Sequence, residues 1–469
     1  MITFPRWVWK LHRWMQLFLY PKFRRKGKTH MNENQRTQAV QELSSEKTEL
    51  KREVGLFGGV SVLAGIMIGS GIFYIGGIVL ERSGMSLGLA LLVWCIGGLV
   101  TLMSGICFAE LGAMMPKAGG SYVYLREAYG ERVAFMSGFS NFILGSSGSN
   151  AALAVAFSAA ISSLMPLGDL TSKLLATFMI AALTAVNIFG IKLGSRVQNI
   201  FMVLKLLPIF VILICGLFMG QQSPDLNPMP ASNPGFAEEI KKPKKNLPLA
   251  IIISIVGVTI LYVLFNYAVY RVLPYDTIAS MIASGDYYLG TAAAQTLFGN
   301  AGMVIVGVAM ILAIFNSLNG CIMVFPRTYY AMARDGAFFK SLAKIHPTYK
   351  TPVNALLVSA LVSIALVWAR DLNQLTSLVA ICGIIFNGMT FFAVILLRKK
   401  YPTMERPYKV WGYPVMIIVI CLVMVGLMIN TFIEDPTTAL IGLLVPIVGL
   451  VLYELVFKKS RQAMLEKEE

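Results

Sequence analysis

The apolar residues of this chain fall into eleven runs, and each run is roughly 20 residues long, enough to cross a bilayer as an α-helix. Because lipid offers no hydrogen-bonding partners, a segment that crosses it must pair its own backbone groups, as a helix does. We therefore predict an all-α polytopic membrane protein. The expected helices cover residues 56–80, 87–111, 134–163, 171–191, 197–219, 248–273, 299–325, 353–369, 374–397, 413–432 and 438–457.

Composition narrows the possible functions. Only 14% of the 469 residues are charged, against about 25% in a soluble domain. The six cysteines lie in apolar runs without C-x-x-C spacing and the three histidines lie outside every predicted span, so we expect no disulfide framework and no metal site. The chain also lacks a phosphate-binding loop, an H-E-x-x-H motif and a nucleophile elbow. These observations argue against an enzyme, a cofactor and ATP-driven transport.

The charge pattern of the loops predicts the topology. The net charge of +16 comes from Lys and Arg in short loops, which mark the cytoplasmic side of a membrane rather than a nucleic-acid surface. Such loops alternate with neutral or acidic loops, except at the connector of residues 223–246, "SPDLNPMPASNPGFAEEIKKPKKN". Its first part fits the outside, whereas "KKPKK" fits the inside. The loops thus require twelve crossings, and a span of about 20 residues is missing between Phe236 and Ala237.

The first 50 residues differ from the rest of the chain. They begin with "MITFPRWVWKLHRWMQLFLY", in which charges interrupt the apolar run too often for a signal peptide, and continue with a polar stretch. A helix lying on the membrane surface and an untranslated leader, with Met31 as the true start, are alternatives. We expect a basic, disordered cytoplasmic extension over 1–50, a transmembrane domain over 51–460 and a cytoplasmic tail over 461–469.

The first span contains the glycine-rich stretch "GIMIGSGIF", residues 65–73. Each of its three glycines weakens a helix by roughly 1 kcal/mol relative to alanine. One interpretation is close helix packing, because Gly65 and Gly69 form a G-x-x-x-G motif. The other is a helix that unwinds over residues 69–71 near the middle of the bilayer, with an outer half-helix that starts at Ile72 and Phe73 and attracts an anion. The pattern leaves both interpretations open.

A lysine lies deep in the fifth span. Lys205, in "NIFMVLKLLPIF", follows Arg196 by nine residues, which is roughly 13 Å along a helix and close to the middle of the bilayer. An ionisable group at this depth is costly and marks a functional site by default. Lys205 either takes the place that a sodium ion holds in ion-coupled transporters, or is a structural cation bonded to backbone carbonyls.

The span over 299–325 carries a second polar group. Asn316, Ser317, Asn319 and Gly320 interrupt its apolar sequence in "AIFNSLNGC". Polar side chains at such positions either line a path through the membrane or form hydrogen bonds between helices. The sequence supports both interpretations.

Five motifs together resemble the signatures of one transporter family. They are "AGIMIGSGIF", "FAELGAMMPKAGGSYVYLREAYG", "AEEIKKPKKNLPLAI", "PRTYYAMARDG" and "RPYKVWGYP". From about residue 50 to the C-terminus, the chain resembles the L-type amino acid transporter branch of the amino acid–polyamine–organocation superfamily, and within it the bacterial serine/threonine exchangers. The resemblance implies an inverted-repeat fold of five plus five helices within twelve, of which this chain holds about eleven, because the sixth helix is the one that is missing.

The resemblance also implies the roles of single residues. The substrate carboxylate is expected on the backbone of Ile68, Gly69, Ser70, Gly71 and Ile72. Lys205 is expected to bridge the first and eighth helices in place of a coupling sodium, with Ser317 and Asn319 as further coupling residues. No metal is implied. The missing sixth helix would hold the other half of the substrate site, so the alternative is a transport-inactive or partial permease, such as a sensor.

Two departures from the family bear on partners and substrates. Residues 164–172, "LMPLGDLTS", lack the cysteine by which animal members bond a heavy chain, so no such partner is expected. The third span, "GFSNFILGSSGSNA", has no cation, which favours small neutral amino acids such as serine, threonine and alanine over anionic ones. The expected protein is an exchanger in the plasma membrane with a cytoplasmic N-terminus, an amino acid substrate, a lipid surround and no nucleic acid. An ion channel is less well supported, because no repeated filter sequence occurs.

Overall fold

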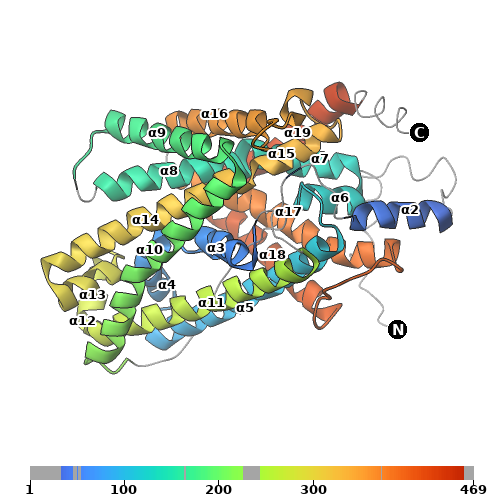
Figure 1. The fold of residues 1–469 in the computed structure, drawn as a ribbon. Coiled ribbons are helices and arrows are strands. Elements are labelled where there is room, and N and C mark those ends of the chain that lie inside the picture. Colours follow the sequence, from blue (N-terminus) through green and yellow to red (C-terminus); the bar gives the residue numbers. More distant parts are fainter. Residues whose placement is uncertain are drawn as a thin grey trace.

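The computed structural model describes residues 33–45, 50, 54–162, 165–224, 243–370 and 372–458, and every regular element within them is a helix (Figure 1). Each predicted span coincides with a helix or a broken helix. Among the described residues, nine helices are long and apolar enough to cross a membrane, and two shorter apolar helices accompany them. The prediction of an all-α polytopic membrane protein is therefore confirmed.

The helices follow one another along the whole described chain. Their bounds are α2 Glu33–Ser44, α3 Leu56–Met67, η1 Ser70–Phe73, α4 Ile75–Arg82, α5 Leu87–Met114, α6 Ser121–Tyr129, α7 Glu131–Ser140, η2 Asn141–Gly145, α8 Ser146–Ser162, α9 Asp169–Ile188, α10 Ile191–Met219, α11 Pro243–Val272, α12 Tyr275–Ala283, α13 Leu289–Phe298, α14 Asn300–Val324, α15 Pro326–Arg334, η3 Lys340–Ala343, α16 Val353–Ala369, α17 Leu372–Lys400, α18 Val415–Glu434, α19 Pro436–Leu452 and η4 Tyr453–Phe457.

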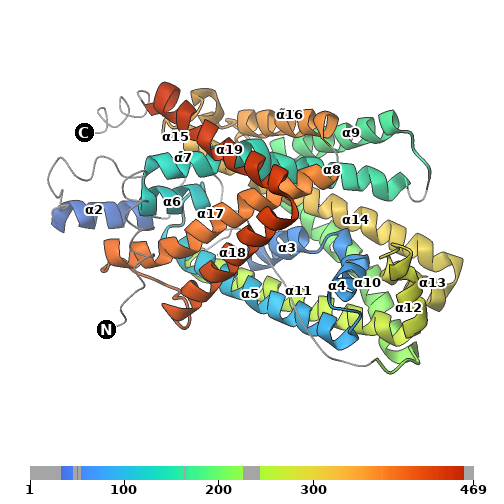
Figure 2. The ribbon, with the colours of Figure 1, turned by 180° about the vertical axis from the view of Figure 1, so that it is seen from behind.

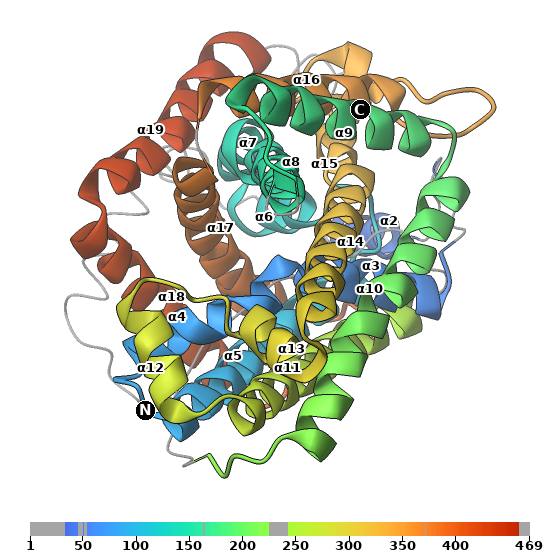
Figure 3. The same cartoon turned by 90° about the vertical axis from the view of Figure 1, so that its left-hand side faces the viewer.

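The short helix α3 occupies a central place in the bundle. It packs against α10, α11 and α14, and α11 in turn runs beside α5 in both opposite views (Figures 1 and 2). Seen end-on, α12 and α13 lie in front, at the end of the molecule toward which α4 points (Figure 3). Any polar group at the end of α3 is thus surrounded by other helices rather than by lipid.

The outer faces of several helices are strongly apolar. Phe218 of α10, Ile433 of α18 and Leu455 of η4 are 84%, 74% and 73% exposed. Apolar surface of this extent would be unfavourable in water and is expected where acyl chains surround a protein. The arrangement agrees with the membrane location predicted from the apolar runs.

The first span is broken, as one interpretation of its glycines predicts. Helix α3 ends at Met67, Ile68 and Gly69 are extended, and a 3₁₀ turn, η1, follows. The outer α-helix α4 starts only at Ile75, so its predicted start at Ile72 and Phe73 is wrong. Those two residues belong to the 3₁₀ turn instead, because the chain needs one more turn after the extended pair to resume the helix direction.

Helices α10 and α11 run in the same direction. Gly216 of α10 lies against Ala268 of α11, and further along both helices the amide of Gln222 donates a hydrogen bond to the carbonyl of Arg271. Figure 1 shows both helices ending at the same end of the molecule. The connector between them, with the predicted gap between Phe236 and Ala237, lies outside the described residues. So do most of the N-terminal extension and the tail over 461–469.

Candidate functional site

Lys205 binds the end of the broken helix. Its side chain is fully buried on α10, and its Nζ donates hydrogen bonds to the carbonyl oxygens of Gly65 at 2.8 Å and Ile68 at 2.6 Å. In an unbroken helix these carbonyls would accept from the amides four residues later. The ammonium therefore replaces two backbone bonds at the break, at the helix end where a positive charge is favoured.

Ser317 reaches the same carbonyl from a third helix. Its hydroxyl lies on α14 and donates to the carbonyl of Gly65 at 2.8 Å. With its oxygen turned toward Lys205, the Asn316 amide would accept a third hydrogen bond from Nζ at 3.2 Å. The break in the first span is thus held between α10 and α14 by one cation and two polar side chains. Lys205 joins the first span to the span that carries Ser317, as the resemblance implies.

Asn319 does not itself contact the break and reaches Lys205 only through Gln198 and the reoriented amide of Asn316. Its Nδ2 donates to Oε1 of Gln198 at 2.8 Å and to the carbonyl of Gly194 at 3.2 Å, while its Oδ1 accepts from Nδ2 of Asn187 at 3.0 Å. These bonds join α14 to α9 and α10 and do not reach the break. The structure therefore brings Ser317, but not Asn319, to the carbonyls of α3, and Asn319 has the interhelical contacts of the structural interpretation.

The predicted carboxylate-binding stretch lies at the break. Gly69, Ser70 and Gly71 are partly exposed, whereas the side chains of Ile68 and Ile72 are 2% and 1% exposed. The first amides of a helical turn have no acceptor within that turn. The apolar side chains thus anchor the stretch on both sides, and the amides at the start of η1 are placed to bind an anion.

Gly65 makes the close approach of three helices possible, as the packing interpretation predicts. A methyl group at this position would lie 2.2 Å from Nε2 of Gln198 and 3.0 Å from Nδ2 of Asn316. At Gly69 it would meet only the hydroxyl of Ser317, at 3.9 Å. Close packing at Gly65 and unwinding at Gly69 are therefore combined in one motif rather than being alternatives.

The substitution Gly65→Ala should destabilise the protein by about 1–3 kcal/mol, because the added methyl group must push α3 away from α10 and α14. Thermal unfolding of the purified protein in detergent measures this effect. Gly69→Ala is the matched control, since its backbone is extended and the space beside it is open. Equal unfolding temperatures for the two variants would contradict the packing role of Gly65.

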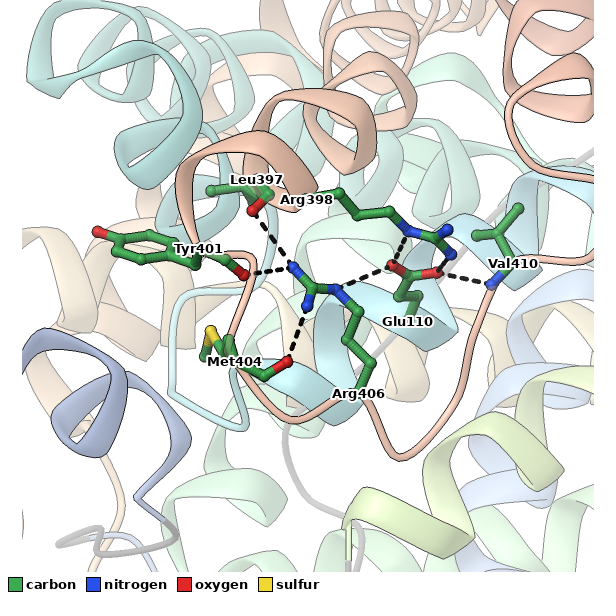
Figure 4. Close-up of polar contacts among 7 residues, drawn as sticks. All are labelled: Glu110, Leu397, Arg398, Tyr401, Met404, Arg406 and Val410. Atoms are coloured by element: carbon green, nitrogen blue, oxygen red, sulfur yellow. Dashed lines mark hydrogen bonds and ion pairs between the residues drawn. The ribbon is translucent and has the colours of Figure 1, made fainter. Parts of the chain in front are cut away.

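A second buried polar cluster joins the far end of α5 to α17 (Figure 4). The carboxylate of Glu110 is 1% exposed and accepts two hydrogen bonds from Arg398, at 2.8 Å from Nε and 2.6 Å from Nη2. It also accepts from the amide of Val410 at 2.6 Å, and Nε of Arg406 lies 3.6 Å away. The paired contact to Arg398 is the strong, planar form of an arginine–carboxylate bond.

Arg406 ties this cluster to the end of α17. Its guanidinium donates to the carbonyls of Tyr401 and Met404 at 2.7 Å each, and to that of Leu397 at 3.3 Å (Figure 4). Burial lowers the pKa of Arg406, and the neighbouring carboxylate of Glu110 acts in the opposite direction. Glu110 and Arg406 were not predicted as site residues, although Glu110 lies in the motif that begins "FAELG" and Arg406 in "RPYKVWGYP". The sequence signal that could have identified Glu110 is a carboxylate near the end of an apolar run.

Across the part of the chain that the structure describes, no group of three His, Cys, Asp or Glu side chains lies close enough to hold a metal ion. The charged group nearest the break is the ammonium of Lys205, which occupies the carbonyls that a cation would need. The position that a cation would take beside these two carbonyls is thus filled by the side chain of Lys205.

Comparison with known proteins gives one family. The sequence model of the amino acid permease family matches residues 54–238 and 231–453. The serine/threonine exchanger SteT of Bacillus subtilis is 32% identical over 438 residues, which cover 88% of this chain and 98% of that protein. The large neutral amino acids transporter small subunit 2 of Mus musculus is 32% identical, covering 86% and 81%. The b(0,+)-type amino acid transporter 1 of Homo sapiens is 30% identical, covering 85% and 86%.

Proposed function

The chain belongs to the amino acid permease family, and we propose that it is a secondary transporter that exchanges small neutral L-amino acids, such as serine, threonine and alanine, by alternating access. Its relatives are transporters and exchangers of amino acids rather than enzymes. The observation that carries the proposal is the broken first span, whose carbonyls are held by Lys205 and whose amides are placed to bind a carboxylate.

The proposed mechanism rests on the hydrogen bonds at the break in the first span, where the carbonyls are already paired with Lys205 and the amides are left for the substrate. The substrate carboxylate binds the amides of residues 69–71, and Ile68 and Ile72 fix that stretch against the bundle. Lys205 provides the positive charge that a coupling ion would otherwise bring, so exchange proceeds without sodium. Ser317 shares the Gly65 carbonyl with Lys205 and passes a movement of α3 to α14. The third span carries no cation, which supports a neutral substrate side chain.

We also propose that an exchange-competent form of this transporter contains a further membrane helix between Phe236 and Ala237. Since α10 and α11 run parallel, the chain must return along the length of α11, which holds 30 residues and is about 45 Å long. Residues 225–242 would reach only about 27 Å as a helix, although fully extended they reach about 60 Å. An extended crossing would leave backbone groups unpaired in lipid.

The comparisons support the same proposal. The alignment with the Bacillus subtilis exchanger is 438 residues long but takes in 88% of the 469 residues of this chain. About 25 aligned positions therefore have no counterpart here, which is close to the length of one membrane helix. The two parts of the family match also meet at residues 231–238. A transport-inactive partial permease is the second candidate function, and the incomplete connector favours it.

Location and partners complete the proposal. The chain is a multi-pass membrane protein. We place it in the plasma membrane with its N-terminus in the cytoplasm. The reason for this orientation is that the N-terminal region is rich in Lys and Arg, and that Lys- and Arg-rich loops then alternate with neutral or acidic ones. It works without a disulfide-linked heavy chain, since the loop between α8 and α9 has no cysteine. Residues 1–50 and 461–469 are assigned to cytoplasmic extensions.

Uptake of radiolabelled serine, threonine and alanine into proteoliposomes tests the proposal. We expect little uptake by the chain as it stands, and uptake that requires unlabelled amino acid inside the vesicles once an apolar helix of about 20 residues is inserted after Phe236. A polar insert of equal length is the matched control. Uptake of all three amino acids without internal amino acid would contradict exchange, and full exchange by the unmodified chain would contradict the need for a sixth helix.

A further inference from the structure

An open cavity lies where α3 and α10 both begin. Its volume is about 400 Å³, within the range of sites that bind small molecules. It is lined by Gly55, Leu56, Phe57, Gly58, Lys192, Ser195, Arg196 and Asn199. The charge pattern of the loops assigns this end of both helices to the cytoplasmic side. The cavity is separate from the break in the first span, which lies at the other end of α3.

The polar lining of this cavity favours an anion. Lys192 and Arg196 stand one turn apart on α10 and both are exposed, and none of the lining residues that the structure describes is acidic. Neither cation has an ion pair with any residue that the structure describes. The start of α3 faces the same space, and its N-cap residue, Gly55, offers no side chain to its first amides. Two free cations beside uncapped amides suit a phosphate group.

The surface beside the cavity is apolar and indicates a lipid rather than a soluble anion. Ile200, Val203 and Leu207 follow Arg196 on the same face of α10 at helical spacing, and they are 57%, 52% and 56% exposed. Phe57, at the rim of the cavity, is 63% exposed. An acyl chain attached to the bound phosphate would lie along this face.

We propose that this cavity binds the headgroup of an anionic phospholipid, for which phosphatidylglycerol is the probe. The phosphodiester contacts Lys192, Arg196 and the first amides of α3, and an acyl chain follows α10. Basic cavities between membrane helices on the cytoplasmic side are a recurrent place for acidic lipid headgroups. The bound lipid would join the start of the first span to α10.

Native mass spectrometry of the full chain in detergent, titrated with phosphatidylglycerol or phosphatidylcholine, tests this proposal. We expect one tightly bound phosphatidylglycerol and no equivalent phosphatidylcholine. The double substitution Lys192→Gln and Arg196→Gln should weaken that binding about 25-fold, since each cation near an anionic lipid contributes about fivefold. The matched control is Lys340→Gln with Lys344→Gln, which removes two exposed lysines from another loop with the same charge pattern. It should bind phosphatidylglycerol like the parent.

A further arm separates the possible ligands. Glycerol 3-phosphate at millimolar concentration should not displace the lipid. The proposal is overturned if both double variants bind phosphatidylglycerol equally, if phosphatidylcholine binds as well, or if glycerol 3-phosphate displaces the lipid, which would identify a soluble anion as the ligand. All readouts are of binding, so they do not depend on transport.

Discussion

Replacing Lys205 by alanine should reduce amino acid exchange at least 100-fold in the form of the chain that is active in proteoliposomes. The ammonium supplies donors to the carbonyls of Gly65 and Ile68 inside the bundle, where no water replaces them. Each buried acceptor left unpaired costs about 1–3 kcal/mol. We expect α3 to move so that these carbonyls find other partners, which misplaces the amides of residues 69–71 that we propose as the carboxylate site.

A second substitution separates the effect of the lost hydrogen-bond donors from that of the lost side-chain volume, and a third serves as a surface control. Lys205→Met keeps most of the side-chain volume but removes the donors, so its exchange rate should fall as far as that of the alanine variant. Lys344→Ala, which removes an exposed lysine, should exchange at the parent rate. Counterflow of radiolabelled serine measures all three. Exchange by Lys205→Ala within twofold of the parent would show that the lysine is a structural cation alone.

Replacing Glu110 by glutamine should lower the free energy of unfolding by about 3–5 kcal/mol, the range for removing one partner of a buried ion pair. Glutamine is close to glutamate in shape but carries no charge, and one of its terminal groups is a donor that would face the guanidinium groups. Arg398 and Arg406 would then share the cluster without a counter-charge. Thermal unfolding in detergent and the yield of folded protein measure the loss.

The control for Glu110 is a carboxylate in an exposed contact. Glu81 accepts a hydrogen bond from Tyr287 at the surface, and Glu81→Gln should change the unfolding free energy by less than about 1 kcal/mol. Removing Arg398 together with Glu110 should cost less than the sum of the two single losses, because the single variants each leave a charge unpaired. An unfolding temperature of Glu110→Gln equal to that of Glu81→Gln would contradict the proposed importance of the cluster.

Much of the fold could be predicted because its signals are local. An apolar run of sufficient length crosses the bilayer whatever its neighbours are, so α10, α14 and α16 lie close to where they were expected. The glycine spacing in residues 65–73 predicted a break, and the distance of Lys205 from Arg196 predicted its depth. The parallel course of α10 and α11 was implied by the loop charges and is now visible in their contacts.

The partners of the buried polar groups were decided by the tertiary structure. Ser317 and Asn319 are two residues apart on one helix, yet one faces the end of α3 and the other faces Gln198, because two residues turn a helix by about 200°. Glu110 and Arg398 are far apart in the sequence and meet only because α17 packs against α5. Sequence determined which residues are buried in the membrane; helix packing determined which of their polar atoms meet, since hydrogen bonds depend on positions to within a fraction of an ångström.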